Sequence, residues 1–410
     1  MGLSGSNVKD YKPPESRMLQ QERHAVLPQP SLSEQARQDF LNQLGKHVLN
    51  EITPGNAAAY QRRVLPRIRA EKGRDPETRH EIRKEMVADP YYQITSSFQR
   101  TVQEMMWNSV DDTIQRQLPE LIETAKNIRE GNTIGSLHLD PDFVIPPYVA
   151  ENDHHCMPGG YSGDLCEDDI TAGALYDKGS FIYTQGLFGP RMDGIGKATA
   201  MMFARCFPEM KPQKILEIGC TAGGSTTGLK LGFPDAEMHA IDVGAAVLRY
   251  GHARAESLGV PIHFHQMNGE DLLFEDNTFD FVNCPASFHE MSRSAVYNVF
   301  EEVHRVLKPG GVFLMSELPP YEGQDPWTQF IRDWDTYNNN EPFWGAVHEL
   351  DFAEVAEKAG FNRDDYWAGT GPGIAEANEL TGAVEVQNRK FMGSTRGGGK
   401  AWYVHVTKRA

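Results

Sequence analysis

The segment 214–228, KILEIGCTAGGSTTG, limits the possible folds of this chain more strongly than any other part of the sequence. It begins with a short apolar run of residues that favour β-strands, and a glycine-rich turn follows. Residues 225–231 can begin a helix, so the segment predicts a buried strand that leads into a loop and a helix N-terminus with free backbone amides. A second apolar segment ends in Asp242, whose carboxylate can accept both hydroxyls of a ribose. Together these features predict a site for a nucleoside-containing ligand.

A mixture of polar and apolar residues follows the third predicted strand. Residues 268–274 read NGEDLLF, and residues 276–280 read DNTFD. Such a segment offers polar atoms to the exocyclic amine of an adenine and apolar flanks to the faces of its ring. It therefore adds a possible base-binding part to the predicted nucleoside site.

Beyond Asp242 the chain alternates predicted strands and helices, as a doubly wound α/β fold should. Predicted helices cover 194–210, 245–258, 296–307 and 352–359, and predicted strands cover 262–266, 279–284, 312–317 and 402–407. Two insertions interrupt this order, one rich in aromatic residues at 319–350 and one rich in glycine and polar residues at 369–398.

The first 130 residues predict an N-terminal arm and a helical region. Residues 1–30 are polar and contain prolines, which is typical of a disordered tail or of an arm that embraces a partner subunit. Ser31 and Glu34 match a helix capping box, and helical periodicity is strongest over 92–128, with a bend expected at Pro119. We expect the apolar stripe of this long helix to be core or dimer contact.

Residues 131–193 are rich in proline and glycine and contain the string DHHCMPGGYSGDLCEDD at 153–169. Long loops in compact proteins are usually functional or disordered, and the aromatic content here favours an ordered one. We predict a loop-rich linker or lid that contributes to the pocket, followed by the ligand-binding domain at 194–410.

The charge balance narrows the possible partners. Forty Lys and Arg against 57 Asp and Glu give a formal net charge of −17, which argues against nucleic acid or an anionic membrane and favours a small neutral or cationic substrate. The five scattered cysteines form no CxxC pair, which is typical of reduced thiols in a cytosolic protein. No apolar run approaches the roughly 18 residues of a membrane span, and the polar N-terminus does not resemble a signal peptide. We therefore expect a cytoplasmic protein.

Four motifs taken together resemble a known family. ILEIGCTAGG, HAIDV, NGEDLLFEDNTFDFV and VHRVLKPGG are similar to the successive motifs of class I S-adenosylmethionine-dependent methyltransferases, in particular the small-molecule UbiE-like (methyltransferase type 11) branch. The resemblance covers 194–407. It implies a Rossmann-like domain with a mostly parallel, doubly wound sheet and an antiparallel last strand, and S-adenosylmethionine as the cofactor.

The resemblance also implies roles for residues of the cofactor site. Gly219 and Gly223 would line the methionine part, Glu217 would order that loop or meet the amino group, and Asp242 would take the ribose diol. Tyr176, Tyr183 and Arg191 could close over the cofactor carboxylate, which an arginine can bind bidentately. The residues expected around the adenine and the sulfonium are Asn268, Gly269, Glu270, Asp271, Leu272 and Cys284.

One residue departs from the family pattern. Thr221 stands where the family usually has glycine, so its side chain could shift the loop or add a hydroxyl contact. The alternative to this family is a dinucleotide-binding Rossmann domain. Its G-x-G-x-x-G pattern fits less well, because Thr221 occupies the second glycine and the acidic residue Glu217 precedes the turn.

The acceptor side of the site is less defined. The 319–350 insertion is predicted to be a lid or pocket wall, which would suit a cationic sulfonium, or a hydrophobic patch that packs on the N-terminal helices, and the two roles are compatible. The candidate substrate-binding residues are aromatic: Tyr161, Phe288, Trp327, Trp334, Phe343 and Trp344.

Histidines are the candidate catalytic bases, since a histidine titrates near neutrality. His289 is favoured over the pair His154 and His155 and over His348, although His289 could instead contact backbone at a helix N-terminus. We predict no metal site, because zinc sites usually show two paired ligand clusters and the segment 153–156 provides one.

The sequence thus predicts an enzyme that transfers a methyl group from S-adenosylmethionine to a small molecule. A hydroxyl or thiol deprotonated by a pocket histidine is the expected acceptor. C-methylation of a ring, or a non-catalytic protein that binds the cofactor while the N-terminal region recruits a partner, are the alternatives. The long helices and the arm predict a homodimer.

Overall fold

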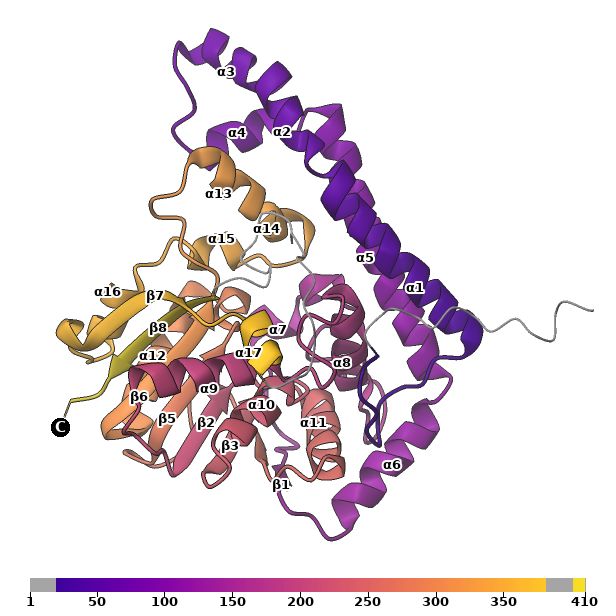
Figure 1. Cartoon of the computed structure of the whole chain (residues 1–410), viewed down its shortest axis with the longest axis vertical. Coiled ribbons are helices and arrows are strands. Elements are labelled where there is room, and N and C mark those ends of the chain that lie inside the picture. Colours follow the sequence, from indigo (N-terminus) through magenta and orange to yellow (C-terminus); the bar gives the residue numbers. More distant parts are fainter. Residues whose placement is uncertain (1–19, 381–400, 410) are drawn as a thin grey trace, which may run out of the picture.

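The computed structural model describes residues 20–380 and 401–409 and has one eight-stranded sheet at its centre (Figure 1). Its strand order is β1-β4-β3-β2-β5-β6-β8-β7, parallel from β1 to β6, with β8 antiparallel to both β6 and β7. The strands are β1 (Ser136–His138), β2 (Lys214–Ile218), β3 (Glu237–Asp242), β4 (His263–Gln266), β5 (Phe279–Pro285), β6 (Leu307–Glu317), β7 (Tyr366–Gly371) and β8 (Ala401–Thr407). The predicted mostly parallel sheet with an antiparallel last strand is confirmed.

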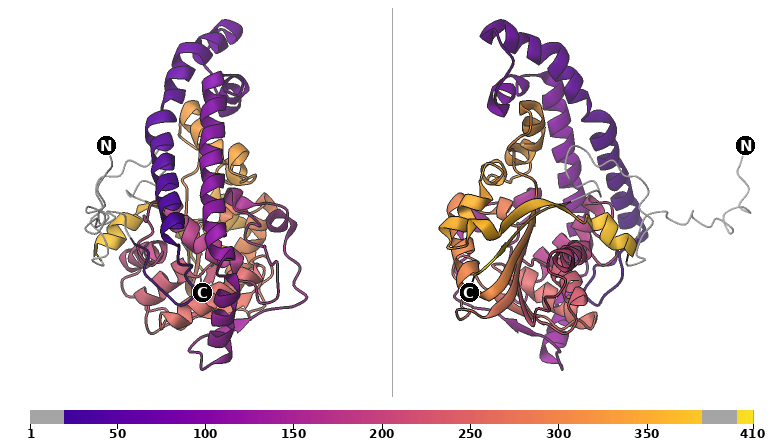
Figure 2. Two further views of the ribbon diagram at one scale, coloured as in Figure 1. Left: turned by 90° about the vertical axis from the view of Figure 1, so that its right-hand side faces the viewer. Right: turned by 60° about the vertical axis from the view of Figure 1, so that its left-hand side comes forward.

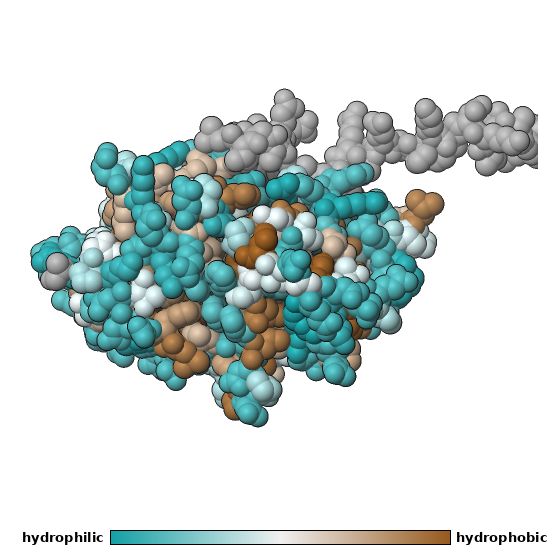
Figure 3. Space-filling model, turned by 90° about the horizontal axis from the view of Figure 1, so that it is seen from below, coloured by the Kyte–Doolittle hydropathy of each residue, from teal (hydrophilic) through white to brown (hydrophobic). Residues whose placement is uncertain are grey.

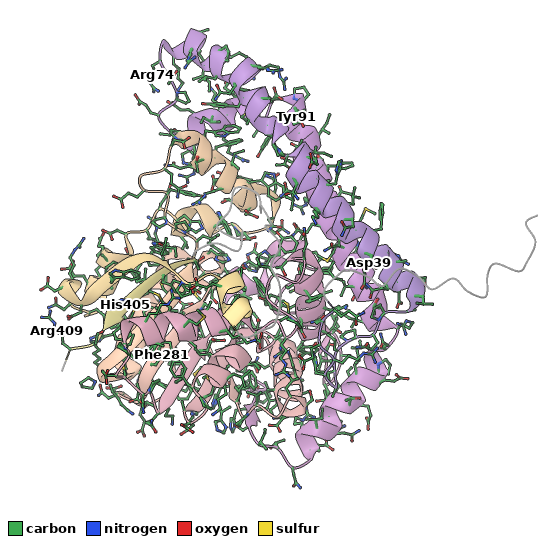
Figure 4. All side chains as sticks on the ribbon, viewed as in Figure 1. Asp39, Arg74, Tyr91, Phe281, His405 and Arg409 are labelled. Carbon is green, nitrogen blue, oxygen red and sulfur yellow. The ribbon has the colours of Figure 1, made fainter. Side chains whose placement is uncertain are left out.

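Both faces of the sheet are covered, because successive side chains of a strand point to opposite sides. On one face Leu216 packs in a core that includes α12 and α16, and on the other Ile215 packs in a core that includes α9, α10 and α11. The covering helices are α9 (Gly194–Cys206), α10 (Gly224–Gly232), α11 (Ala245–Ser257), α12 (Arg293–Val306) and α16 (Phe352–Lys358). Figure 4 labels Phe281 within the sheet, and this side chain belongs to the second of these cores.

The N-terminal helices form an arm beside the sheet domain, with α1 and α5 packed along each other (Figures 1 and 2). Figure 4 labels Arg74 at the far end of this arm and Asp39 on α1. The helices are α1 (Leu32–His47), η1 (Val48–Ile52), α2 (Gly55–Ala59), η2 (Tyr60–Val64), α3 (Leu65–Lys72), α4 (Arg79–Met86), α5 (Pro90–Gln115) and α6 (Leu118–Glu130).

The arm follows the sequence closely. The capping box is present, since Glu34 N–H donates to Oγ of Ser31 and the Glu34 carboxylate accepts from Ser31 N–H. The long predicted helix is divided into α5 and α6 just before Pro119, whose ring cannot continue a regular helix. Part of its apolar stripe is core, including Val102 and Met106, whereas Phe98 and Met105 are 44% and 45% exposed.

The aromatic insertion packs on the arm. Its helices are α13 (Pro326–Arg332), α14 (Trp334–Asn338) and α15 (Trp344–Val347). Phe330 and Trp334 share a buried cluster with Tyr60, Tyr92 and other residues of the arm. Arg79 adds ion pairs to Asp333 at 3.1 Å and Glu349 at 2.6 Å. Of the two predictions for this insertion, the hydrophobic patch against the N-terminal helices describes most of its aromatic residues.

Several elements were not predicted. The segment expected to be rich in loops contains the edge strand β1, α7 (Pro147–Ala150), η3 (His154–Cys156) and the buried helix α8 (Thr171–Tyr183). In α8, Gly179 allows close approach, because a Cβ there would lie 2.0 Å from the Trp107 ring. The remaining elements are η4 (Phe288–Glu290), η5 (Arg363–Asp365) and α17 (Ile374–Leu380). Residues 1–19, part of the tail or partner-embracing arm predicted at 1–30, lie outside the described residues, as do 381–398 of the second insertion.

The face shown in Figure 3 is mostly hydrophilic, with scattered hydrophobic side chains. Among the described residues, no helix combines the length and the apolar character that a membrane crossing requires.

Candidate functional site

A first cavity of about 1060 Å³ lies at the carboxyl ends of the parallel strands, where open α/β sheets bind ligands. We call it the nucleoside cavity. Three segments from the central motifs line it: the turn after β2, Asp242 at the end of β3 with Val243 after it, and residues 267–269 after β4. Further lining comes from Pro285, Ala286, Ser287, Tyr148, Tyr161, Tyr176, Asp177, Phe188, Met192, Ile195, Glu290 and Met291.

The turn after β2 brings bare backbone to the cavity. Gly219 and Gly223 have φ of +74° and +72°, but Gly219 lines the cavity and Gly223 lies outside the lining. A Cβ on Gly219 would lie 2.5 Å from Oγ of Ser287. Thr221 adopts φ +45°, a left-handed conformation that glycine takes freely and threonine rarely does. The turn therefore keeps a glycine-like backbone at the position where this chain departs from the family pattern.

Asp242 connects this turn to β3. Its Oδ2 accepts from Thr221 N–H at 2.9 Å and its Oδ1 accepts from Gly244 N–H at 3.1 Å. Burial raises the pKa of Asp242, and these backbone donors oppose the rise. Each carboxylate oxygen has a second lone pair, so the side chain can still accept two hydroxyls from the cavity.

Glu217 is fully buried and lies behind the turn, outside the lining of the nucleoside cavity. Its carboxylate accepts from Thr226 Oγ1 at 2.6 Å, Ser225 Oγ at 3.1 Å and Asn283 Nδ2 at 2.7 Å. Burial raises the pKa of Glu217 to about 7, against these donors. This arrangement favours the loop-ordering role over contact with the cofactor amino group.

The predicted adenine segment lies only partly at the cavity. Asn268 and Gly269 line it, while Glu270 accepts from Tyr148 Oη at 2.8 Å. Leu272 and Cys284 are buried in the hydrophobic core, and Asp271 is exposed outside the lining. The two apolar side chains face the core rather than the ligand because burial there removes them from water.

Arg191 does not reach the nucleoside cavity. Its Nη2 forms an ion pair with Glu22 at 2.6 Å. The guanidinium that was expected to bind the cofactor carboxylate is therefore bound to the segment before α1. Tyr183 lines a second cavity instead. Tyr176 and Asp177 of α8 line the nucleoside cavity, but α8 itself was not predicted.

The second cavity, of about 1310 Å³, adjoins the first, and we call it the acceptor-side cavity. The two share six lining residues: Tyr161, Tyr176, Phe188, Ile195, Ala286 and Glu290. The rest of the acceptor-side lining is mainly aromatic or apolar and includes Trp107, Tyr183, Leu187, Ile374, Trp402 and Tyr403. Its charged part consists of His155, His289, Glu290 and Glu317.

The charged part is held by close contacts. Nδ1 of His289 lies 2.7 Å from Oε1 of Glu317, and Nε2 of His155 lies 2.9 Å from Oε1 of Glu290. Tyr161 Oη donates to the same Glu290 oxygen at 3.2 Å. Burial lowers the pKa of His289, but Glu317 and the other nearby carboxylates outweigh it and raise this pKa to about 9.

The structure separates the other predicted histidines. His155 lines the acceptor-side cavity, whereas His154 is fully buried outside both linings, with Nε2 3.3 Å from Oε2 of Glu290. His348 also lies outside the linings, and burial lowers its pKa to about 4.

Only one of the predicted aromatic substrate residues, Tyr161, lines the cavities. Trp327 stacks on Tyr60 at 4.4 Å between ring centroids, and Trp334 Nε1 donates to Ser96 Oγ at 3.0 Å. These rings pack on the arm rather than in the cavities, because the arm offers them an apolar surface. Phe288, Phe343 and Trp344 are likewise absent from both linings, and Trp344 lies edge-on to His289.

Comparison with known proteins agrees with the central motifs. Residues 215–311 match the family model described as a methyltransferase domain. The UbiE ubiquinone/menaquinone biosynthesis C-methyltransferase of Brucella canis is 32% identical over 158 residues, which cover 34% of this chain and 58% of that protein. A fatty-acid O-methyltransferase of Mycolicibacterium smegmatis is 30% identical over 125 residues, which cover 30% of this chain and 44% of that protein. The matches thus span about half the length of these relatives.

A solved structure of Haemonchus contortus phosphoethanolamine N-methyltransferase 2 with S-adenosyl-L-methionine aligns with a TM-score of 0.41 and 18% identity, over 57% of each chain. The strand order, the glycine turn before α10 and the match over 215–311 stand together in one part of the molecule. The sheet domain is therefore a class I S-adenosylmethionine-dependent methyltransferase domain.

Proposed function

We propose that the protein is an enzyme that transfers a methyl group from S-adenosylmethionine to a small molecule. The residues of the nucleoside cavity suit this cofactor: Asp242 offers two acceptor oxygens for a ribose, and the turn at Gly219 brings bare backbone to the cavity. Met267 and Asn268 combine an apolar flank with amide atoms suited to a base. When bound, the cofactor supplies a methyl group on a sulfonium, which leaves as a neutral thioether.

The acceptor in this proposal is a hydroxyl or thiol that binds in the acceptor-side cavity. The shared lining carries the proposal, because Glu290 and Ala286 border both cavities and His289 adjoins them on the acceptor side. A molecule in the second cavity would then meet a methyl group presented from the first. This placement supplies the proximity on which methyl transfer depends.

The acceptor must lose a proton as its oxygen or sulfur forms the new bond to carbon. In the simplest form of the proposal, the neutral form of His289, which the raised pKa makes more abundant at alkaline pH, accepts this proton at Nε2, while Glu317 fixes the ring through Nδ1. His155, held between Glu290 and Glu341, is the second candidate on the same wall. The mainly apolar remainder of the cavity would exclude water from the reaction.

Two alternatives have support of their own. The Brucella canis relative is named a C-methyltransferase, and an aromatic cavity also suits a ring substrate methylated on carbon. A non-catalytic binding protein would need no second cavity next to the nucleoside cavity, so the shared lining favours the enzyme.

We also propose a cytoplasmic homodimer. All five cysteines are free thiols, which suits a reducing compartment. Ile94, Phe98 and Met105 form an exposed apolar stripe on α5, with Ile94 65% exposed, and such a stripe suits contact with a second copy. Sedimentation velocity over a range of protein concentrations would decide between monomer and dimer.

A transfer assay with radiolabelled methyl groups tests the proposed activity. Purified protein is incubated with labelled S-adenosylmethionine and panels of phenols, thiols, amines and quinones. Label on a phenol or thiol supports the proposal, and label found only on ring carbon favours the C-methylation alternative. Cofactor binding without transfer to any panel would favour the non-catalytic alternative.

A further inference from the structure

Four side chains from three distant parts of the chain converge beside the acceptor-side cavity. They are His155 of η3, His289 and Glu290 of η4, and Glu341 of the aromatic insertion. Each offers one nitrogen or oxygen atom, and these four atoms all lie within 4.8 Å of one another. We propose that this cluster is a binding site for a divalent transition-metal ion such as Zn²⁺.

The chemistry of the ligand set supports a metal of this class. Two imidazoles and two carboxylates suit zinc and its neighbours, whereas Mg²⁺ and Ca²⁺ prefer oxygen ligands alone. Four ligands at zinc–ligand distances near 2.1 Å lie roughly 3.4 Å apart in a tetrahedron, so the side chains need to move inward by about 1 Å. His155 contacts both carboxylates, with Nδ1 2.8 Å from Oε1 of Glu341 and Nε2 2.9 Å from Oε1 of Glu290, and the metal would replace the contact at the nitrogen that it binds.

A second observation points to a missing partner. Oε2 of Glu341 is buried and has no hydrogen-bond partner among the described residues, although the side chain is completely shielded from solvent. Nε2 of His289 lies 4.0 Å from this oxygen, too far for a hydrogen bond. Since an unpaired buried carboxylate oxygen is costly, an atom between these two groups would stabilise the arrangement.

The local charge favours a cation. Three carboxylates, those of the buried Glu317 and Glu341 and the half-buried Glu290, face the two imidazoles of His155 and His289. Metal binding requires neutral imidazoles, so in the loaded site a divalent ion would balance most of the carboxylate charge. Glu317 would then act behind the ligands, since it holds Nδ1 of His289 and leaves Nε2 for the metal.

The inference rests on the proposed function and specifies its deprotonation step. With a metal bound, His289 is a ligand, and the charge of the metal lowers the pKa of a neighbouring hydroxyl or thiol. The acceptor then loses its proton to solvent as it binds, before the apolar lining excludes water and the oxygen or sulfur attacks the methyl carbon. The metal would thus do the work that the simpler form of the proposal gives to a free imidazole.

Zinc binding tests the site without any methyl acceptor. Full-length protein is freed of metal with a chelator, and Zn²⁺ is titrated by calorimetry into wild type, Glu341→Gln, His155→Gln and the exposed control Glu354→Gln. We expect one strong site in wild type and in the control, and at least tenfold weaker binding in the first two variants. When Co²⁺ replaces zinc, wild type should show the visible absorption of a tetrahedral site, whereas Glu341→Gln and His155→Gln should not. Mg²⁺ should not compete at equal concentration.

Equal zinc affinity in wild type, Glu341→Gln and His155→Gln would overturn the inference, because the ion would then bind elsewhere. Melting temperature and S-adenosylhomocysteine affinity check that the variants fold. If one of Glu341→Gln and His155→Gln does not fold, the zinc affinity of the other tests the site. Zinc bound at this site without methyl transfer to any acceptor would contradict the proposed function alone. Full methyl transfer by protein that binds no zinc at this site would contradict this inference alone.

Discussion

Nδ1 of His289 lies 2.7 Å from Oε1 of Glu317, and this pair joins the carboxyl ends of two neighbouring strands. Glu317 is the last residue of β6, and His289 follows β5 in η4. Both are buried and border the acceptor-side cavity next to the shared lining. Parallel strands thus carry the polar pair to the edge of the sheet where the nucleoside cavity also lies.

Replacing His289 should reduce catalysis more than cofactor binding. His289→Gln removes the nitrogen proposed to act as the base, so we expect methyl transfer to fall by about 100-fold or more. S-adenosylhomocysteine affinity should change little, because His289 is absent from the lining of the nucleoside cavity. The exposed His80→Gln serves as the control. An equal loss of turnover and affinity would show a structural role instead.

Asp242 and Asp271 make a matched pair for the cofactor site. Asp242→Asn should weaken S-adenosylhomocysteine binding by about 10- to 100-fold, because a carboxylate–hydroxyl hydrogen bond contributes roughly 1.5–3 kcal/mol. Asp271→Asn should leave affinity unchanged, since Asp271 is exposed outside the lining. Calorimetry on both variants measures the difference. If both variants bound S-adenosylhomocysteine with similar affinity, Asp242 would not be the residue that binds the ribose.

Glu217 should make stability depend on pH. Burial raises its folded-state pKa to about 7 from an ordinary value of 4.5, so the folded protein holds this proton more tightly than the unfolded chain. The associated stability is complete below about pH 4.5 and is lost as pH rises through 7. Glu217→Gln should flatten this part of the profile by up to about 3 kcal/mol, at 1.36 kcal/mol per pH unit. Denaturant unfolding at pH 5 and pH 8 measures it, and a parallel profile in the variant would refute the assignment.

His265 should act in the opposite direction. Burial and the neighbouring His239, His138 and His263 lower its pKa from 6.5 to about 3. Its contribution to stability is therefore complete above pH 6.5 and is lost as pH falls towards 3. His265→Phe, which can pack against Phe274, should be less sensitive to acid than wild type. Thermal melts between pH 4 and pH 7 test this, and an unchanged slope in the variant would contradict it.

Two glycines test the packing of α5. Gly179→Ala would place a Cβ 2.0 Å from the Trp107 ring, and overpacking of this kind costs about 1–3 kcal/mol. In Gly45→Ala the new methyl group would contact Val102 at an ordinary 3.6 Å. The protein should therefore be unchanged in stability or more stable by about 0.5–1 kcal/mol, because alanine favours the helix α1 more than glycine does. Chemical denaturation compares the two variants. Equal stabilities would mean that Trp107 can move away without cost.

The sequence predicted the parts of the molecule that follow local rules. The apolar run within 214–218, the capping box at Ser31 and the glycine turn each depend on neighbouring residues, and each is present in the structure. The helix α8 was not predicted, because its small and polar residues are not typical of a buried helix. Its glycines allow Trp107 and Tyr250 to pack closely against it.

Long-range pairing explains the remaining differences at the site. Arg191 has a bidentate geometry suited to a carboxylate, but Glu22, far away in sequence, occupies it. Trp327 and Trp334 pack on the arm for the same kind of reason. His155, His289, Glu290 and Glu341 come from segments with no common motif, so spacing along the chain could not bring them together.

A crystal structure with bound S-adenosylhomocysteine would decide whether the two cavities work together, because it locates the cofactor relative to both. We predict ribose hydroxyls within hydrogen-bond distance of the Asp242 carboxylate, and a sulfur atom at the lining shared by Ala286 and Glu290, open to the acceptor-side cavity. A ribose bound away from Asp242, or a sulfur sealed off from His289 and the second cavity, would contradict the proposed methyl transfer between them.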